Sequence, residues 1–167
     1  RLRPHGRMGP LAVSVPNAVE YYVDFGRAWE RQALIKARPC AGDLALGEAF
    51  RRQMRPFVFP RYFDDAMLVD IRETKQQTEE IIARRGLTER EVKLGRGGIR
   101  DIEFTVQMLQ LLYGGHRKAL RGVNTLTAID VLGRNGYLSP LEATALADHY
   151  VFLRRVEHQL QLEQGRQ

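Results

Sequence analysis

The sequence predicts a mainly α-helical protein in two parts. The first, residues 1–56, combines strand and helix, and the second, residues 57–167, is an antiparallel helical bundle. Three observations support this. Proline and glycine interrupt the first part at short intervals, which leaves room only for short elements. In the second part, apolar residues recur at helical spacing over longer segments. The connections between those segments are short, as they are between antiparallel neighbours in bundles.

The first part predicts one short strand and three short helices. Residues 11–15 alternate apolar and small side chains, as a strand does. Proline at a first helical position or just beyond a helix end marks the boundaries of the helices. The last of them is expected to stop before Pro56, because proline lacks a backbone N–H and its ring clashes with the preceding turn. The predicted helices cover residues 16–25, 27–38 and 44–54.

The second part predicts four helices. A long helix follows Pro60, and a connector rich in charge and glycine, residues 87–98, separates it from the next. The clearest cap in the chain precedes the last helix, where Ser139 is the N-cap, Pro140 takes the first helical position and Glu142 completes a capping box. The predicted spans are 61–85, 99–113, 125–134 and a helix that starts at residue 140.

The stretch KLGRGGIRDIEF, residues 93–104, allows two interpretations. As a strand it would place Asp101 and Glu103 on one side, where two carboxylates suit a magnesium ion. As a helix it would place them about 200° apart around the axis, so that they could not share one ion. The unbroken segment 99–113 is longer than most strands and glycines bound it, which favours the helix.

On the helical interpretation, the glycines lead into a helix N-terminus, where unpaired N–H groups and the helix dipole attract anions. Gly97 and Gly98 would let a phosphate approach, and nearby cations would add charge. The alternative is that the glycines only make the turn. Two other sets of cations allow the same two interpretations, phosphate binding or exposed surface charge. One set ends the helix over 27–38, and the other lies in the extended N-terminal run. The candidate phosphate-binding residues are Arg1, Arg3, Lys36, Arg38, Lys93, Arg96, Gly97, Gly98 and Arg100.

Composition narrows the class of protein. The 167 residues are 44% hydrophobic and 28% charged, as in an ordinary globular protein. The net charge is +6, and the dispersed cations favour point contacts to phosphate over a nucleic-acid arm. A solvated basic surface accounts for the same charge equally well. No apolar run reaches the roughly 18 residues of a membrane span, and no signal peptide is evident.

Cysteine and histidine give no sign of a metal site. Cys40 is the single cysteine, which fits a reducing compartment, and the four histidines show no ligand spacing with it or with one another. Because the chain starts with RLRP and ends within a helical pattern, we expect it to be part of a longer protein.

Five blocks of sequence carry a resemblance to a known family. In chain order they are RLRPHGRMGPL, WERQALIKAR, RPFVFPRYFD, VKLGRGGIRDIEFTVQ and FLRRVEHQLQ. Together they resemble the bifunctional glutamine synthetase adenylyltransferase/adenylyl-removing enzymes. That family has two related halves, each a nucleotidyltransferase domain followed by helices. The blocks GRGGIRDIEF and RLRP-x-G-x-x-GPL look like the first half, which removes the adenylyl group.

The resemblance implies a fold and a domain division. Residues 1–56 would be the end of an α/β nucleotidyltransferase domain. Residues 57–167 would be an antiparallel helical domain, similar to the module shared with the uridylyltransferases of the PII signal protein and truncated at its C-terminus. The fold class is then mainly α.

The resemblance also implies a reaction. The first half of the family carries out Mg²⁺-dependent phosphorolysis of adenylyl-tyrosine on glutamine synthetase, which yields ADP and controls nitrogen assimilation. Its metal-binding carboxylates would lie upstream of Arg1, so this chain would hold no catalytic residue and would be inactive alone. The implied partners are glutamine synthetase, PII, ATP or ADP and phosphate, with no nucleic acid and no membrane, in the cytoplasm.

Two other functions stay open on the sequence. The helices from residue 57 onward would also suit a non-catalytic regulatory or docking module for PII or glutamine synthetase. A small basic nucleic-acid-binding protein is the third class, and it would bind DNA or RNA with a steep dependence on salt.

Overall fold

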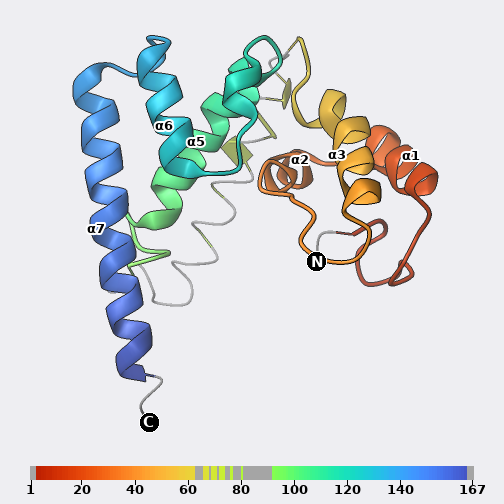
Figure 1. The fold of residues 1–167 in the computed structure, drawn as a ribbon, viewed down its shortest axis with the longest axis horizontal. Coiled ribbons are helices and arrows are strands. Elements are labelled where there is room, and N and C mark those ends of the chain that lie inside the picture. Colours follow the sequence, from red (N-terminus) through yellow and green to blue (C-terminus); the bar gives the residue numbers. More distant parts are fainter. Residues whose placement is uncertain are drawn as a thin grey trace.

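The computed structural model describes residues 3–62, 66, 67, 69, 70, 72, 73, 76, 80 and 92–164. Within those residues the elements are helices and no strand occurs, which confirms the mainly α prediction. The elements in chain order are α1 (Val15–Phe25), α2 (Ala28–Leu34), α3 (Leu44–Val58), α5 (Ile99–Gly114), the 3₁₀ helix η1 (Lys118–Arg121), α6 (Thr125–Arg134) and α7 (Pro140–Gln164). Helices α1, α2 and α3 gather at one end of the molecule, and α7 runs along the opposite edge beside α5 and α6 (Figure 1).

The strand predicted over residues 11–15 is wrong. Leu11 is 88% exposed and Val13 38% exposed, so neither side chain has a core to face. Ser14 has extended backbone but serves as the N-cap of α1, where its hydroxyl accepts a hydrogen bond from the N–H of Asn17. Alternation alone does not make a strand, because a strand also needs a neighbour to pair with.

Helix α2 ends at Leu34, four residues before its predicted end. The N–H groups of Ile35 and Lys36 donate to carbonyls three residues back, which tightens the chain into a turn. That turn buries Ile35, which is 2% exposed, and directs Lys36 inward. The helix was expected to reach Pro39, but burial of these two side chains ends it earlier.

Helix α3 continues through Pro56 to Val58, so the prediction that proline ends it is wrong. Asp43 caps its start by accepting a hydrogen bond from the N–H of Leu46 at 3.0 Å. Proline removes one helical N–H near the C-terminal end. The continued helix buries Phe57 and Val58, and the N–H of Phe59 then closes on the carbonyl of Arg55 at 2.9 Å. Burial of these apolar side chains, worth about 1.5–3 kcal/mol each, offsets the lost hydrogen bond.

The helix spans predicted for the second part are confirmed for the three helices that the structure describes from residue 99 onward. Helices α5 and α6 cover the predicted spans to within one residue, and α7 begins at Pro140. Its capping box is formed in both directions, since the N–H of Ser139 donates to Glu142 at 2.8 Å and the N–H of Glu142 donates to the Ser139 hydroxyl at 3.3 Å. Most of the helix predicted over 61–85 lies outside the described residues. Those described between residues 66 and 80 are helical.

Helix α5 joins two hydrophobic clusters. Its residue Leu111 packs with the side chains of α1, α2 and α3, while Ile102 and Val106 pack against η1 and α6. At its end, Gly114 lies so close to the ring of Phe59 that a Cβ there would meet ring carbon at 2.5 Å. Helix α5 therefore holds the α1–α3 group against the α6–α7 group.

Polar contacts cross the same junction. Gln32 on α2 donates to Gln107 on α5 at 2.9 Å. Gln110 is fully buried, and its amide donates to the carbonyls of Leu120 and Gly122 at 2.6 and 2.8 Å. These bonds fix η1, a 3₁₀ helix that the sequence did not predict. Its four residues are too short to show a period.

Candidate functional site

The glycine turn before α5 closes on itself. The N–H of Gly98 donates to Gly95 at 2.9 Å, and the N–H groups of Ile99 and Arg100 donate to the carbonyls of Val92 and Lys93, each at 3.0 Å. These are the N–H groups that a helix start leaves free for an anion. In this conformation they already have acceptors, so the turn offers a ligand its basic side chains rather than its backbone.

The two glycines of the turn have different roles. Gly97 has φ +74°, in the left-handed region that disfavours other residues. Gly98 has φ −74°, which any residue adopts, but a Cβ there would lie 2.7 Å from the Val92 carbonyl oxygen and 2.8 Å from that of Gly95. The first glycine is needed for backbone conformation and the second for space.

The acidic pair of the motif diverges, as the helical interpretation predicted. Asp101 accepts a hydrogen bond from the N–H of Gly97 at 2.8 Å and so closes the turn. Glu103 faces α7, where it accepts from the hydroxyl of Tyr150 at 2.9 Å and pairs with Arg154 at 3.2 Å. The two carboxylates are therefore engaged in separate structural contacts rather than at one ion.

A chain of charges ties the turn to α7. Arg154 pairs with Glu157 at 2.6 Å, and Glu157 also lies 3.6 Å from Lys93 of the turn. Glu157 is only 10% exposed, and its hydrogen bond from Arg154 lowers the pKa of its carboxyl. Burial lowers the pKa of Arg154, but hydrogen bonds to Glu157 and Tyr150 outweigh it and raise the pKa overall. Lys93 thus has a structural partner, while the exposed Arg96 has none in the described part of the chain.

Lys36 and Arg38 lie in different surroundings although they are two residues apart in the sequence. The ammonium of Lys36 turns into the junction and donates to the carbonyl of Val123 and the hydroxyl of Thr125, each at 2.8 Å. Burial lowers its pKa, with Glu103 opposing the shift. Arg38 is exposed and lines a cavity.

The remaining predicted phosphate-binding residues do not share one location. Arg1 lies outside the described residues. Arg3 turns back on its own loop, where its Nε donates to the carbonyl of Gly6 at 2.6 Å. Arg100 lies with its guanidinium 5.2 Å from the ring centre of Phe104 on the same helix. The structure therefore links Lys36 electrostatically to Glu103, and of the eight candidates that it describes only Arg38 lines the cavity between α2, α3 and η1 or the hollow that adjoins it. Phosphate binding by them stays a prediction.

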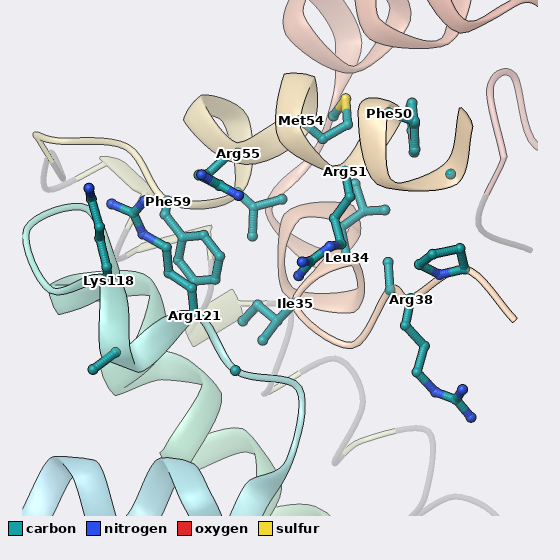
Figure 2. A pocket seen from close by; sticks show the side chains of 16 residues that line it. Leu34, Ile35, Arg38, Phe50, Arg51, Met54, Arg55, Phe59, Lys118 and Arg121 are labelled. Carbon is teal, nitrogen blue, oxygen red and sulfur yellow. The ribbon is translucent and has the colours of Figure 1, made fainter. Parts of the chain in front are cut away.

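A cavity of about 740 Å³ opens between α2, α3 and η1. Apolar residues of α2 and α3 form much of its lining, and Figure 2 shows Arg51 reaching over Leu34 and Ile35. Arg55, Lys118 and Arg121 lie on one side of it around Phe59, whereas the guanidinium of Arg38 is directed away from the other labelled side chains. The basic residues that line it are Arg38, Arg51, Arg55, Lys118 and Arg121.

Sequence reasoning selected only Arg38 of these five. The others lie on two segments more than 60 residues apart, and no motif connects the segments. The one sequence signal is the spacing of Arg51 and Arg55, which puts two cations on one face of a helix. The partner face on η1 follows only from the fold.

Two features that the described residues lack bear on the class of site. Among the described residues, no group of three or more His, Cys, Asp or Glu side chains is placed to hold a metal ion. Across the same part of the chain, none of the helices combines the length and apolar character needed to cross a membrane.

Comparison with known families gives the class of protein. Residues 65–167 match the family described as GlnD PII-uridylyltransferase, and residues 1–53 match the family described as glutamate-ammonia ligase adenylyltransferase. The first match covers more than half of the chain, which therefore belongs to the family described as GlnD PII-uridylyltransferase. Neither match covers residues 54–64, and α3 ends within that stretch at Val58.

Individual proteins similar to this chain indicate a particular enzyme within these families. The chain is 46% identical to the bifunctional glutamine synthetase adenylyltransferase/adenylyl-removing enzyme of Stenotrophomonas maltophilia over 162 residues. It is 46% identical to the enzyme of that name from Mesorhizobium japonicum and 43% identical to that of Rhodopseudomonas palustris, each over 167 residues. Each comparison covers 97% of this chain but 17% of the relative. The resemblance found in the sequence is confirmed, and the chain spans about one sixth of the length of these relatives.

Proposed function

We propose that the chain is part of the deadenylylating half of a glutamine synthetase adenylyltransferase. The observation that carries the proposal is similarity over 97% of the chain to enzymes named for adenylyl transfer and adenylyl removal. The choice of half rests on the GRGGIRDIEF and RLRP blocks. The division at residues 56 and 57 is part of the same proposal.

The proposed reaction is phosphorolysis of adenylyl-tyrosine on glutamine synthetase. An oxygen of inorganic phosphate attacks the phosphorus of the adenylyl group, and the bond from that phosphorus to the tyrosine oxygen breaks. ADP and the unmodified tyrosine hydroxyl are the products. Phosphate, and not water, is the nucleophile that removes the adenylyl group. The reaction would serve control of nitrogen assimilation in the cytoplasm.

Mg²⁺ would be held by carboxylates outside this chain. The described residues do not fit a magnesium site, because Asp101 and Glu103 are engaged in separate contacts and no metal-binding cluster occurs among those residues. The contribution of this chain would be fixed positive charge near an anionic substrate, at Arg96 and Arg100 in particular. By itself the chain would have no activity.

The test uses the complete enzyme with Arg96→Ala and Arg100→Ala. We expect kcat/KM for phosphate to fall about tenfold for each variant, the loss of one charged contact, with the adenylylation rate unchanged. Arg134→Ala is the matched control, since Arg134 is an exposed arginine on α6 that pairs only with Asp130 in the described chain. Unchanged kcat and KM for both variants would remove this turn from the site.

A second candidate function is docking of PII or glutamine synthetase. The match of residues 65–167 to a PII-uridylyltransferase family favours it, and α7 exposes Leu141 by 80% and Phe152 by 63%. Capture of purified PII by the 167-residue chain, abolished by Phe152→Asp, would support docking. Capture that is unaffected by Phe152→Asp would remove this face of α7 as the docking surface.

A further inference from the structure

The cavity between α2, α3 and η1 carries an unbalanced charge. Its described lining includes five cationic side chains and no Asp or Glu. Arg51 has a partner in Glu48 at 3.0 Å, and Arg121 donates to the carbonyls of Gly114 and Gly115. In the part of the chain that the structure describes, the side chains of Arg55 and Lys118 form no hydrogen bond and no ion pair.

Three of the cations, Arg55, Lys118 and Arg121, lie together on one side of the cavity around Phe59 (Figure 2). Burial lowers the pKa of Arg121, and the positive charge of Arg55 lowers it further. A second basic hollow adjoins the first and shares Arg55, Phe59, Lys118 and Arg121 with it, so the positive surface is continuous. Gathering like charges is unfavourable, and an anion bound between them relieves the repulsion.

The other half of the cavity is apolar. Leu34 of α2, Ile35 of the turn after it, and Phe50, Met54 and Val58 of α3 line it. A volume of about 740 Å³ lies within the usual range of about 300–1,000 Å³ for small-molecule sites. An inorganic anion would leave this apolar surface unused, whereas a ligand with a flat apolar group and an anionic tail would cover both halves.

We propose that this cavity binds a nucleoside phosphate, with its base on the apolar lining of α2 and α3 and its phosphates at Arg55, Lys118 and Arg121. Arg121 is held by the two carbonyls at the end of α5 and lies over the ring of Phe59, so its guanidinium is already oriented. Arg55 and Lys118 supply the charge that has no partner in the described chain. The ligand then contacts residues of both family matches, Phe50 of α3 in the first and η1 in the second, while Arg55 lies between the two matches.

The proposal rests on the proposed function only in the choice of an adenine nucleotide as the first probe. Binding is measured on the 167-residue chain and needs no turnover, while the proposed reaction is measured on the complete enzyme. Failure of one therefore does not imply failure of the other.

The experiment is titration of the chain with a fluorescent ADP analogue, mant-ADP, with unlabelled ADP as competitor. Arg55→Ala and Lys118→Ala are each expected to weaken binding about tenfold, as loss of a charged contact does. Arg117→Ala is the matched control, because Arg117 is an exposed arginine directly before Lys118 that lines neither hollow. It is expected to change the affinity less than twofold. Equal effects of the three variants would overturn the proposal.

Hydrogen exchange in the presence of ADP locates the bound ligand. Competition by pyrophosphate and by adenosine against mant-ADP identifies the class of ligand. ADP is expected to slow exchange in residues 50–59 and 118–122, and pyrophosphate is expected to compete more weakly than ADP. Pyrophosphate that binds as tightly as ADP would show an inorganic anion site and overturn the assignment of a nucleoside. Binding without slower exchange in either segment would place the ligand elsewhere and also overturn it.

Discussion

Substitution of Gly98 by alanine tests how the turn before α5 is built. The backbone at Gly98 has φ −74° and ψ −177°, so alanine suffers no conformational strain there. Its Cβ would lie 2.7, 2.8 and 3.1 Å from the carbonyl oxygens of Val92, Gly95 and Lys93. Each oxygen must move by about 0.3–0.7 Å to restore an ordinary contact of 3.4 Å. All three oxygens accept the hydrogen bonds that close the turn.

The cost follows from those hydrogen bonds. Weakening two or three of them, at about 1 kcal/mol each, predicts a loss of about 2–3 kcal/mol in the free energy of unfolding. Gly97→Ala is the control. Gly97 has φ +74° and open space around its Cβ position, which predicts a smaller loss of about 1 kcal/mol from backbone strain.

Urea unfolding followed by circular dichroism measures both variants. We expect Gly98→Ala to lower the free energy of unfolding more than Gly97→Ala does, although Gly97 has the unusual backbone conformation. A Gly98→Ala variant within 0.5 kcal/mol of the parent, or one less destabilised than Gly97→Ala, would refute it.

Three further substitutions test other contacts. Gln110→Leu keeps the buried volume but leaves two carbonyls near η1 without a donor, and we expect a loss of about 2 kcal/mol in urea unfolding; a loss under 0.5 kcal/mol would show that water replaces the amide. Arg154→Met leaves Glu157, among the described residues, with only the more distant Lys93 at 3.6 Å, and we expect a loss of about 1–2 kcal/mol at pH 7, reduced from the value for fully buried pairs because Arg154 is 36% exposed. The folded-state pKa of Glu157 is lowered, so this contribution is present above pH 4.5 and is lost as the pH falls through the folded pKa. The variant should therefore lose less stability on acidification than the parent, and an equal loss would contradict the assignment. Ser139→Ala should cost about 1 kcal/mol and raise the pKa of Glu142 only in part in an NMR titration, because the backbone N–H of Ser139, which alanine keeps, is the larger cause of its lowering; an unchanged free energy of unfolding would show that the cap does not hold in solution.

Local signals predicted much of the second part. The glycines around α5 and the Ser139 capping box act through backbone groups a few residues away, so the sequence contains both partners of each contact. For the same reason the divergence of Asp101 and Glu103 followed from helical spacing alone. These features hold wherever neighbouring residues decide the conformation.

Contacts between distant segments decided the rest. Helix α3 passes Pro56 because Phe57 and Val58 gain burial against helices elsewhere in the chain, which no local rule on proline anticipates. Lys36 was predicted at a phosphate site, and the structure gives it acceptors almost 90 residues away. The cavity was missed for the same reason, since its two cationic segments, on α3 and η1, lie far apart in the sequence and come together only in the fold.

The assignment of this chain to the deadenylylating half is tested most directly by identifying the product of adenylyl removal by the complete enzyme. Adenylylated glutamine synthetase would be incubated with isotopically labelled inorganic phosphate, Mg²⁺ and the enzyme, and the nucleotides would be separated. The account predicts that the label appears in ADP, and that Arg96→Ala and Arg100→Ala slow its appearance while leaving ATP-dependent adenylylation unchanged. Release of unlabelled AMP, or a defect confined to adenylylation, would contradict the assignment of this chain to the deadenylylating half.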